Sequence, residues 1–152
     1  MNAWLNAVAV WQSGFPFGIS SGRDNSFTGG TDRGEYLGGG SAQLRYDRPH
    51  AEMIQKWFDT SKFTFNPVGT FGNTGRNFLR GPRYFNTDFG LLKVIKVSGR
   101  IGLQFRAEAF NVFNTVNFAL PSSNVSAAQF GQITGVVPES QRIIQLGLKA
   151  IF

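Results

Sequence analysis

The chain has 152 residues, of which 41% are hydrophobic and 16% are charged, so its composition excludes intrinsic disorder and fits one domain at most. It contains no cysteine, which excludes disulfide bonds and thiolate metal sites. The net charge is +6, but the basic residues are scattered along the sequence and form no dense run, so we expect no nucleic-acid binding.

The first residues do not form a recognisable export signal. Residues 1–11 lack a basic segment, and no small-residue cleavage site follows them. There is no run of about 18 apolar residues, so we expect no transmembrane helix, whereas a strand of a membrane barrel needs only about 9–11 alternating residues. A secreted protein without such a signal is expected to be a fragment, with its natural start upstream or its reading frame truncated.

The first predicted strand runs roughly over residues 5–19. Its odd positions are mostly apolar, and its even positions are polar or small except for Val8 and Val10. The alternation is clear only from Trp11 onward. Pro16 lies near one end of the segment, where a strand tolerates proline best.

Residues 20–85 are predicted to form a long region without regular structure, because glycine recurs throughout it. The exception is a short helix over residues 50–59, with Pro49 at its first turn. The apolar stripe of this helix would contain Ala51, Ile54, Trp57 and Phe58. A structureless stretch of this length is unusual in a compact soluble domain but ordinary in an extracellular loop of a barrel.

Two further strands are predicted over residues 86–97 and 101–111, joined by a turn at Ser98-Gly99-Arg100. In the first of them Lys93 interrupts an otherwise apolar face, which predicts a β-bulge there. In the second the alternation is clear. One face carries Ile101, Leu103, Phe105, Ala107 and Ala109, and the opposite face carries Gly102, Gln104, Arg106 and Glu108.

The last predicted strand, residues 143–152, follows a second long loop that reaches to about residue 141. One face carries Ile144, Leu146, Leu148, Ala150 and Phe152. The other carries Gln145, Gly147 and Lys149, and Ile143 and Ile151 are exceptions to the alternation. An apolar face that ends on an aromatic residue is typical of the strand that closes an outer-membrane barrel.

The connections between the four strands are long, short and long, at about 65, three and about 30 residues, as in barrels with short periplasmic turns and long outer loops. The predicted fold is therefore all-β: about four antiparallel strands of an incomplete transmembrane barrel, with long extracellular loops. The side chains expected to face lipid are Leu103, Phe105, Ala107, Leu146 and Leu148. Those expected to face the lumen are Gln104, Arg106 and Glu108.

Four segments are spread over nearly the whole chain: Trp11-Gln-Ser-Gly-Phe-Pro-Phe17, residues 69–82, residues 103–114 and Gln141-Arg-Ile-Ile-Gln-Leu-Gly-Leu-Lys-Ala-Ile-Phe152. In this order they resemble the carboxy-terminal part of TonB-dependent receptors whose members carry an amino-terminal carboxypeptidase-regulatory-like domain. The resemblance implies a barrel of about 22 strands, plugged by an amino-terminal domain, that imports nutrients. Residues 1–152 would be the carboxy-terminal segment of such a barrel, without the plug and amino-terminal domains, and not transport-competent alone.

The resemblance also implies partners and a location in the cell outer membrane as part of the full-length protein. The partners would be outer-membrane lipid, the remaining barrel and plug, and the barrel-assembly machinery; TonB would act only through the absent amino-terminal parts. The last strand resembles the signal that the assembly machinery reads. Its places are held by Gln145, Gly147, Ala150 and Phe152, although an ordinary amphipathic strand would also fit this loose pattern.

No pattern predicts a catalytic, cofactor or metal site, and we expect no enzyme activity. The only histidine is His50, which excludes a site with several histidine ligands. The glycines at 69, 72 and 75 lack the lysine and the helix of a phosphate loop, and the aspartates at 24, 32 and 47 lack calcium-loop spacing. Arg106 and Glu108 would meet on the lumen face, either as a structural ion pair or as a substrate contact.

The alternative function is a small soluble β-rich module for glycan binding or adhesion, which would use Trp11, Trp57 and the phenylalanine-rich loops. The chemistry of the strand faces separates the two hypotheses. A transporter fragment leaves its apolar faces for lipid to cover, whereas a soluble module must pair them into one core.

Overall fold

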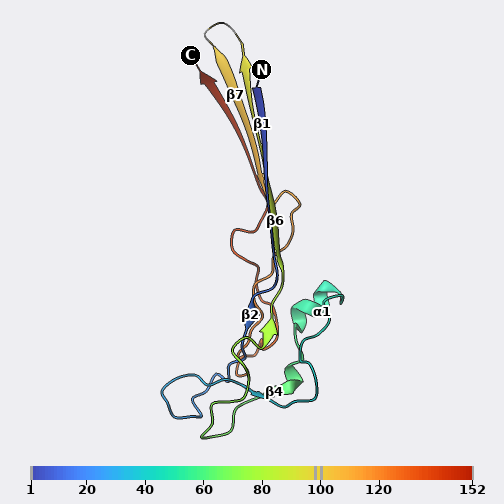
Figure 1. The fold of residues 1–152 in the computed structure, drawn as a ribbon, viewed down its shortest axis with the longest axis vertical. Helices are drawn as coiled ribbons and strands as arrows, with labels where there is room; N and C mark the ends of the chain where they lie inside the picture. The colour runs from blue at the N-terminus through green and yellow to red at the C-terminus, as the bar shows by residue number, and fades with distance from the viewer. Residues whose placement is uncertain (1, 98, 100, 152) are drawn as a thin grey trace. The chain divides into compact units, whose positions relative to one another are not determined.

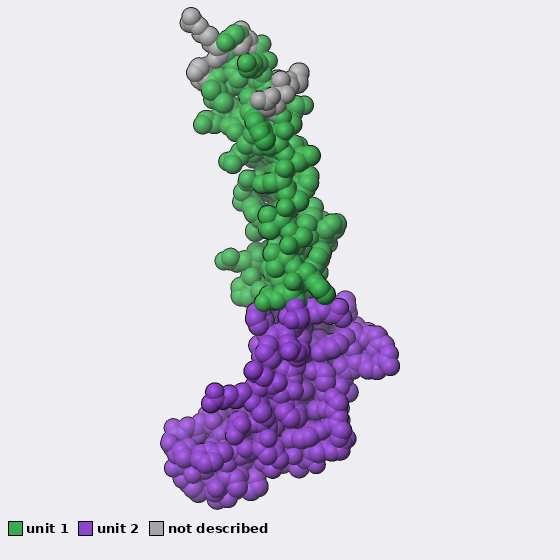
Figure 2. Space-filling view, in the orientation of Figure 1, with its two compact units in different colours: residues 1–12, 84–117, 136–152 green, residues 13–83, 118–135 purple. Residues whose placement is uncertain are grey.

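The computed structural model describes residues 2–97, 99 and 101–151, and the chain divides into two compact units (Figures 1 and 2). The first unit, here called the sheet unit, comprises residues 1–12, 84–117 and 136–152. The second, here called the loop unit, comprises residues 13–83 and 118–135. The loop unit is thus made from the two long connections between strands of the sheet unit.

The sheet unit contains one antiparallel four-stranded sheet in the order β1–β6–β7–β8. Its strands are β1 (Asn2–Gln12), β6 (Tyr84–Lys96), β7 (Gly102–Phe110) and β8 (Ile143–Ile151). In the part of the chain that the structure describes, the sheet does not close, and β1 and β8 are its two edges. The predicted all-β fold with four antiparallel strands and an incomplete barrel is therefore confirmed.

The predicted hairpin over residues 86–111 is formed by β6 and β7. The Val97 N–H donates a hydrogen bond of 2.9 Å to the Ile101 carbonyl, which closes the hairpin across its turn. Two residues of the predicted turn, Ser98 and Arg100, lie outside the described residues. The register runs without interruption through Lys93, which pairs with Phe105 on β7 and Ala3 on β1. The predicted bulge at Lys93 is therefore wrong, because this lysine keeps its place in the alternation.

The strand predicted over residues 5–19 is wrong in its extent, because β1 ends at Gln12. Gln12 pairs with Tyr84, the first residue of β6. Continuing the same register would place Gly14 opposite Pro82, and proline has no N–H to donate to a ladder. The backbone of Gly81 also lies so close to Gly14 that no side chain fits there. Pairing therefore stops at the entrance to the loop unit.

The loop unit has a hydrophobic core, although residues 20–85 were predicted to lack regular structure. Its buried residues are Phe17, Ile19, Ala42, Trp57, Phe58, Phe63, Leu79 and Ile133. Phe58 is fully buried, with its ring centroid 5.6 Å from that of Phe63 and 5.3 Å from that of Phe130. Burying one such side chain contributes about 1.5–3 kcal/mol. Packing of dispersed aromatic residues therefore replaces long regular elements in this unit.

Short elements frame this core. Two two-stranded sheets pair β2 (Pro16–Phe17) with β5 (Leu79–Arg80) and β3 (Glu35–Tyr36) with β4 (Phe63–Thr64). The segment between β3 and β4 contains α1 (His50–Gln55) and a 3-10 turn at Thr60–Lys62. None of the helices formed by the described residues is long and apolar enough to cross a membrane.

The helix predicted over residues 50–59 is shorter than expected. It ends at Gln55 because Lys56 adopts an extended conformation with φ −149°. Pro49 occupies the N-cap position, not the first turn. Trp57 and Phe58, predicted to belong to the helical stripe, enter the core from the extended segment that follows. The helix ends here because both side chains become buried and because the Trp57 N–H donates a hydrogen bond of 2.8 Å to the Gly131 carbonyl.

A buried polar network holds the loop that precedes β3. Asp32 is buried and accepts hydrogen bonds from the Ser26 hydroxyl at 2.6 Å, the Ser26 N–H at 2.8 Å and the Asn66 side-chain amide at 3.0 Å. The Ser26 hydroxyl is the main cause that lowers the pKa of the Asp32 carboxyl below its usual value, and burial acts in the opposite direction. The charged form of Asp32 is therefore the form that this network stabilises.

Candidate functional site

The three residues predicted to face a lumen, Gln104, Arg106 and Glu108, share one face of β7. Across β8 they lie opposite Lys149, Gly147 and Gln145, respectively. The medium that this polar face meets stays a prediction.

Strands β1 and β6 extend the polar face with two cross-strand rows. One row joins Trp4, Leu92 and Arg106, and the next joins Asn6, Gly90 and Glu108. The Asn6 side chain lies directly over Gly90, where a larger residue would collide with it. The glycine thus makes room for an amide in the middle of the sheet.

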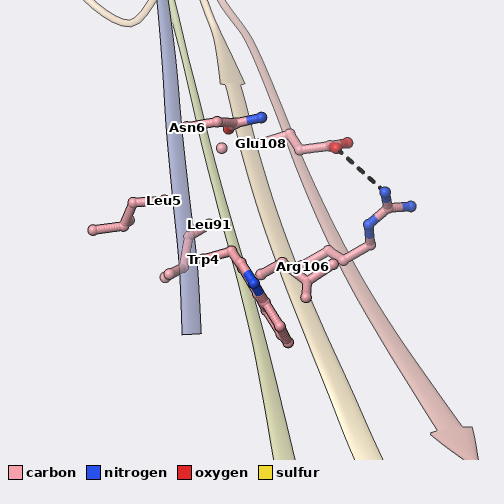
Figure 3. Close-up of a pocket in the computed structure, with 8 residues that line it drawn as sticks. Trp4, Leu5, Asn6, Leu91, Arg106 and Glu108 are labelled. Carbon is pink, nitrogen blue, oxygen red and sulfur yellow. Dashed lines mark ion pairs between the residues drawn. The ribbon is translucent and has the colours of Figure 1, made fainter. Parts of the chain in front are cut away.

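A hollow of about 310 Å³ lies over these rows (Figure 3). In the figure Asn6, Arg106 and Glu108 extend to one side of the sheet, whereas Leu5 and Leu91 extend to the other. The hollow offers an indole ring, an amide, a guanidinium and a carboxylate, which suit hydrogen bonding to polar groups. Sequence reasoning did not identify Trp4 and Asn6, although the even positions of β1 place both on this face.

Arg106 and Glu108 form the ion pair expected from the sequence, with 4.0 Å between a guanidinium nitrogen and a carboxylate oxygen. Their side chains are 59% and 39% exposed. An exposed pair of this length contributes at most about 1 kcal/mol. Both residues also belong to the same strand, so their pairing orients two side chains and does not link strands. Across the described ranges, no group of three or more histidine, cysteine or carboxylate residues could hold a metal ion.

The opposite face of the sheet is mostly apolar, with Lys93 and Thr87 of β6 as its polar exceptions. The residues predicted to face lipid lie there in adjacent pairs, Leu103 beside Ala150, Phe105 beside Leu148 and Ala107 beside Leu146. Leu146 and Leu148 are each 72% exposed. Soluble monomers rarely expose a continuous apolar surface of this kind, which therefore calls for a covering partner.

Comparison with known proteins identifies the family to which these strands belong. Residues 3–145 match the model of the protein family described as an outer membrane beta barrel domain. The chain belongs to this family. No curated protein and no solved structure matches the chain. The four strands are accordingly part of an outer-membrane β-barrel protein, and its location is the outer membrane.

The strand β8 carries the residues that resemble an assembly signal in this outer-membrane β-barrel protein. Gln145 and Gly147 lie on the polar face and Ala150 lies on the apolar face, whereas Phe152 lies outside the described residues. One side of β8 pairs with β7, and its other side is an edge of the sheet. The recognition of these four residues by the assembly machinery stays a prediction.

Three buried polar residues fix the ends of the strands, and sequence reasoning missed them. Within the described part of the sheet unit, Asn111, Asn117 and Ser140 are the buried residues. The Asn117 amide accepts a hydrogen bond of 2.9 Å from the Phe85 N–H and donates one of 3.0 Å to the Phe85 carbonyl. It therefore pairs with Phe85 as a neighbouring strand would.

Asn111 has a related role at the end of β7. Its amide donates to the carbonyls of Ser140 at 2.6 Å and Thr115 at 2.9 Å, and its oxygen accepts from the Thr115 N–H at 2.9 Å. It adopts a positive φ of 47°, a conformation that asparagine tolerates better than most residues. The available signal was the recurrence of asparagine at 111, 114 and 117, from the last residue of a predicted strand onward, which marks turns.

Proposed function

We propose that this outer-membrane β-barrel protein is the carboxy-terminal segment of a TonB-dependent receptor for nutrient uptake, and that it does not transport alone. The observation that carries the proposal is the open four-stranded sheet, with an apolar face, a polar face and two free edges. The four segments that resemble these receptors supply the finer assignment. The substrate would be selected by parts of the receptor outside this chain together with its outer loops.

Four strands would not make a complete membrane barrel, because open strand edges are costly in lipid. Closed membrane barrels have about eight strands or more. Each unsatisfied backbone group in hydrocarbon costs several kcal/mol, and both β1 and β8 present a row of such groups. The remaining strands of the receptor would pair with these edges, and its plug would lie against the polar face.

The alternative of a soluble glycan-binding module has less support. It required Trp57 as a binding platform, but Trp57 is 5% exposed and its indole N–H donates to the Arg80 carbonyl at 2.8 Å. Trp11 is exposed, but it belongs to the apolar face of the sheet. Neither tryptophan therefore presents a ring beside polar groups, as glycan recognition requires.

The proposal is tested first on the gene. Sequencing the DNA upstream of the Met1 codon should reveal an in-frame plug domain and a TonB-engaging motif. The complete product should then support uptake of its nutrient only in cells that contain TonB, with a general porin substrate as the control. A complete reading frame without a plug, or uptake that persists without TonB, would refute the receptor assignment and leave the barrel family unaffected.

A further inference from the structure

Basic residues that are far apart in the sequence meet in the loop unit. A shallow hollow of about 390 Å³ is lined by Arg45, Tyr46, Asp47 and Arg83. Two hydrogen bonds connect the segment that contains Arg45 with the segment that contains Arg83. The Arg80 N–H donates to the Gln43 side-chain oxygen at 3.0 Å, and the Trp57 indole N–H donates to the Arg80 carbonyl at 2.8 Å. The hollow is therefore built by the fold of the unit and not by one flexible loop.

The positive charge at this hollow is only partly compensated. Arg45 donates to both carboxylate oxygens of Asp47, and these two charges neutralise each other. Among the residues that the structure describes, no carboxylate lies within ion-pair distance of Arg80 or Arg83. The Arg80 guanidinium donates to the Gly14 carbonyl at 3.3 Å, which fixes its position without removing its charge. Two positive charges therefore remain beside Tyr46.

Tyr46 adds a neutral donor to these charges. Its ring lies 5.5 Å from the Trp57 ring, centroid to centroid, and 43% of the residue is exposed. Burial raises the pKa of the Tyr46 hydroxyl, although Arg80 and Arg83 act in the opposite direction. The hydroxyl thus keeps its proton at neutral pH and can donate a hydrogen bond.

We propose that this hollow binds a phosphate group, with Arg83 and the Tyr46 hydroxyl as donors and Arg80 as a second positive charge. Guanidinium groups match the oxygens of phosphates and carboxylates, often through two parallel hydrogen bonds. A phosphate monoester carries a charge of about −1.5 to −2 at pH 7, close to the two uncompensated charges, whereas a single carboxylate would balance only one of them. The phosphate is part of either a soluble ester or a lipid headgroup.

The test uses the full chain in a non-ionic detergent, with inorganic pyrophosphate as the probe in a calorimetric titration at low salt. We expect saturable binding that Arg83→Gln weakens at least about tenfold, the usual effect of losing one charged hydrogen bond. Tyr46→Phe should weaken binding by a smaller factor. The control is Arg76→Gln, which removes an exposed arginine of the same unit that does not line the hollow.

Two results would overturn the proposal: no saturable binding to the wild-type chain, or equal weakening by Arg83→Gln and Arg76→Gln. Circular dichroism of each variant verifies that the fold is unchanged. A second titration in micelles doped with a phosphorylated lipid separates the two sources of phosphate. Competition by the doped lipid assigns the hollow to a lipid headgroup, and unchanged pyrophosphate binding assigns it to a soluble phosphate ester.

Discussion

Phe58 in the loop unit is fully buried among other aromatic rings, whereas Leu148 in the sheet unit is 72% exposed. The buried residues of the sheet unit that the structure describes are all polar, and they lie at the ends of strands. We propose that two solvents account for this contrast. In this proposal the loop unit forms its own core in water, whereas the sheet unit leaves its apolar face for the outer membrane to cover.

The largest effect is expected from a substitution that removes the central side chain of the loop-unit core. Phe58→Ala should destabilise the loop unit by about 3–5 kcal/mol, because it leaves a cavity where the side chain is fully enclosed. Hydrogen exchange followed by mass spectrometry should show faster exchange in residues 13–83 and no change in β7. The matched control is Phe27→Ala, since Phe27 is 75% exposed in the same unit and should have little effect. Equal effects of the two substitutions would contradict a core centred on Phe58.

The second effect concerns the apolar face. Leu148→Arg in the full-length barrel should cost about 2–4 kcal/mol if its position lies near the middle of the bilayer. The fraction of heat-modifiable, folded protein in the membrane should fall accordingly. The neighbouring substitution Lys149→Arg preserves the charge on the polar face and should leave that fraction unchanged. Tolerance of Leu148→Arg would place this face away from lipid.

The third effect concerns the rim of the sheet. Asn117→Ala should destabilise the pairing beside Phe85 by about 1–3 kcal/mol, because it leaves the partly buried N–H and carbonyl of Phe85 without their partner. Exchange of the Phe85 amide should become faster in nuclear magnetic resonance spectra. Asn114→Gly, which removes an exposed side chain nearby and suits the positive φ of 54° at this position, serves as the control. An unchanged Phe85 exchange rate would show that the Asn117 amide does not hold this strand.

The smallest effect is a pH dependence of the loop unit. The pKa of Asp32 is lowered in the folded state, so its stabilising contribution is complete above the unfolded value of 3.8. That contribution should be lost as the pH falls from 3.8 through the lower folded pKa. Comparing the acid unfolding of the loop unit in the wild type and in Asp32→Asn tests this contribution. Identical slopes below pH 3.8 would rule it out.

The sequence predicted the sheet unit better than the loop unit for a physical reason. In a strand with one polar and one apolar face, side-chain polarity alternates with a period of two, so β7 and β8 could be recognised from their own residues. The core of the loop unit joins Phe17, Phe58 and Ile133 from an irregular backbone, and no local period marks them. The hollow that contains Arg45 and Arg83 was hidden for the same reason, because only the tertiary fold brings its two segments together.

The most direct test of the account compares the environments of β8 side chains on the two faces of the sheet in the full-length barrel. The chain has no cysteine, so single cysteines placed at Leu146, Leu148 and Lys149 and spin-labelled meet no background signal from this segment. In lipid bilayers, labels at 146 and 148 should be accessible to oxygen and protected from a water-soluble relaxing agent, with the reverse at 149. The same accessibility at all three positions, or protection from oxygen at 146 and 148, would contradict the claim that lipid covers the apolar face.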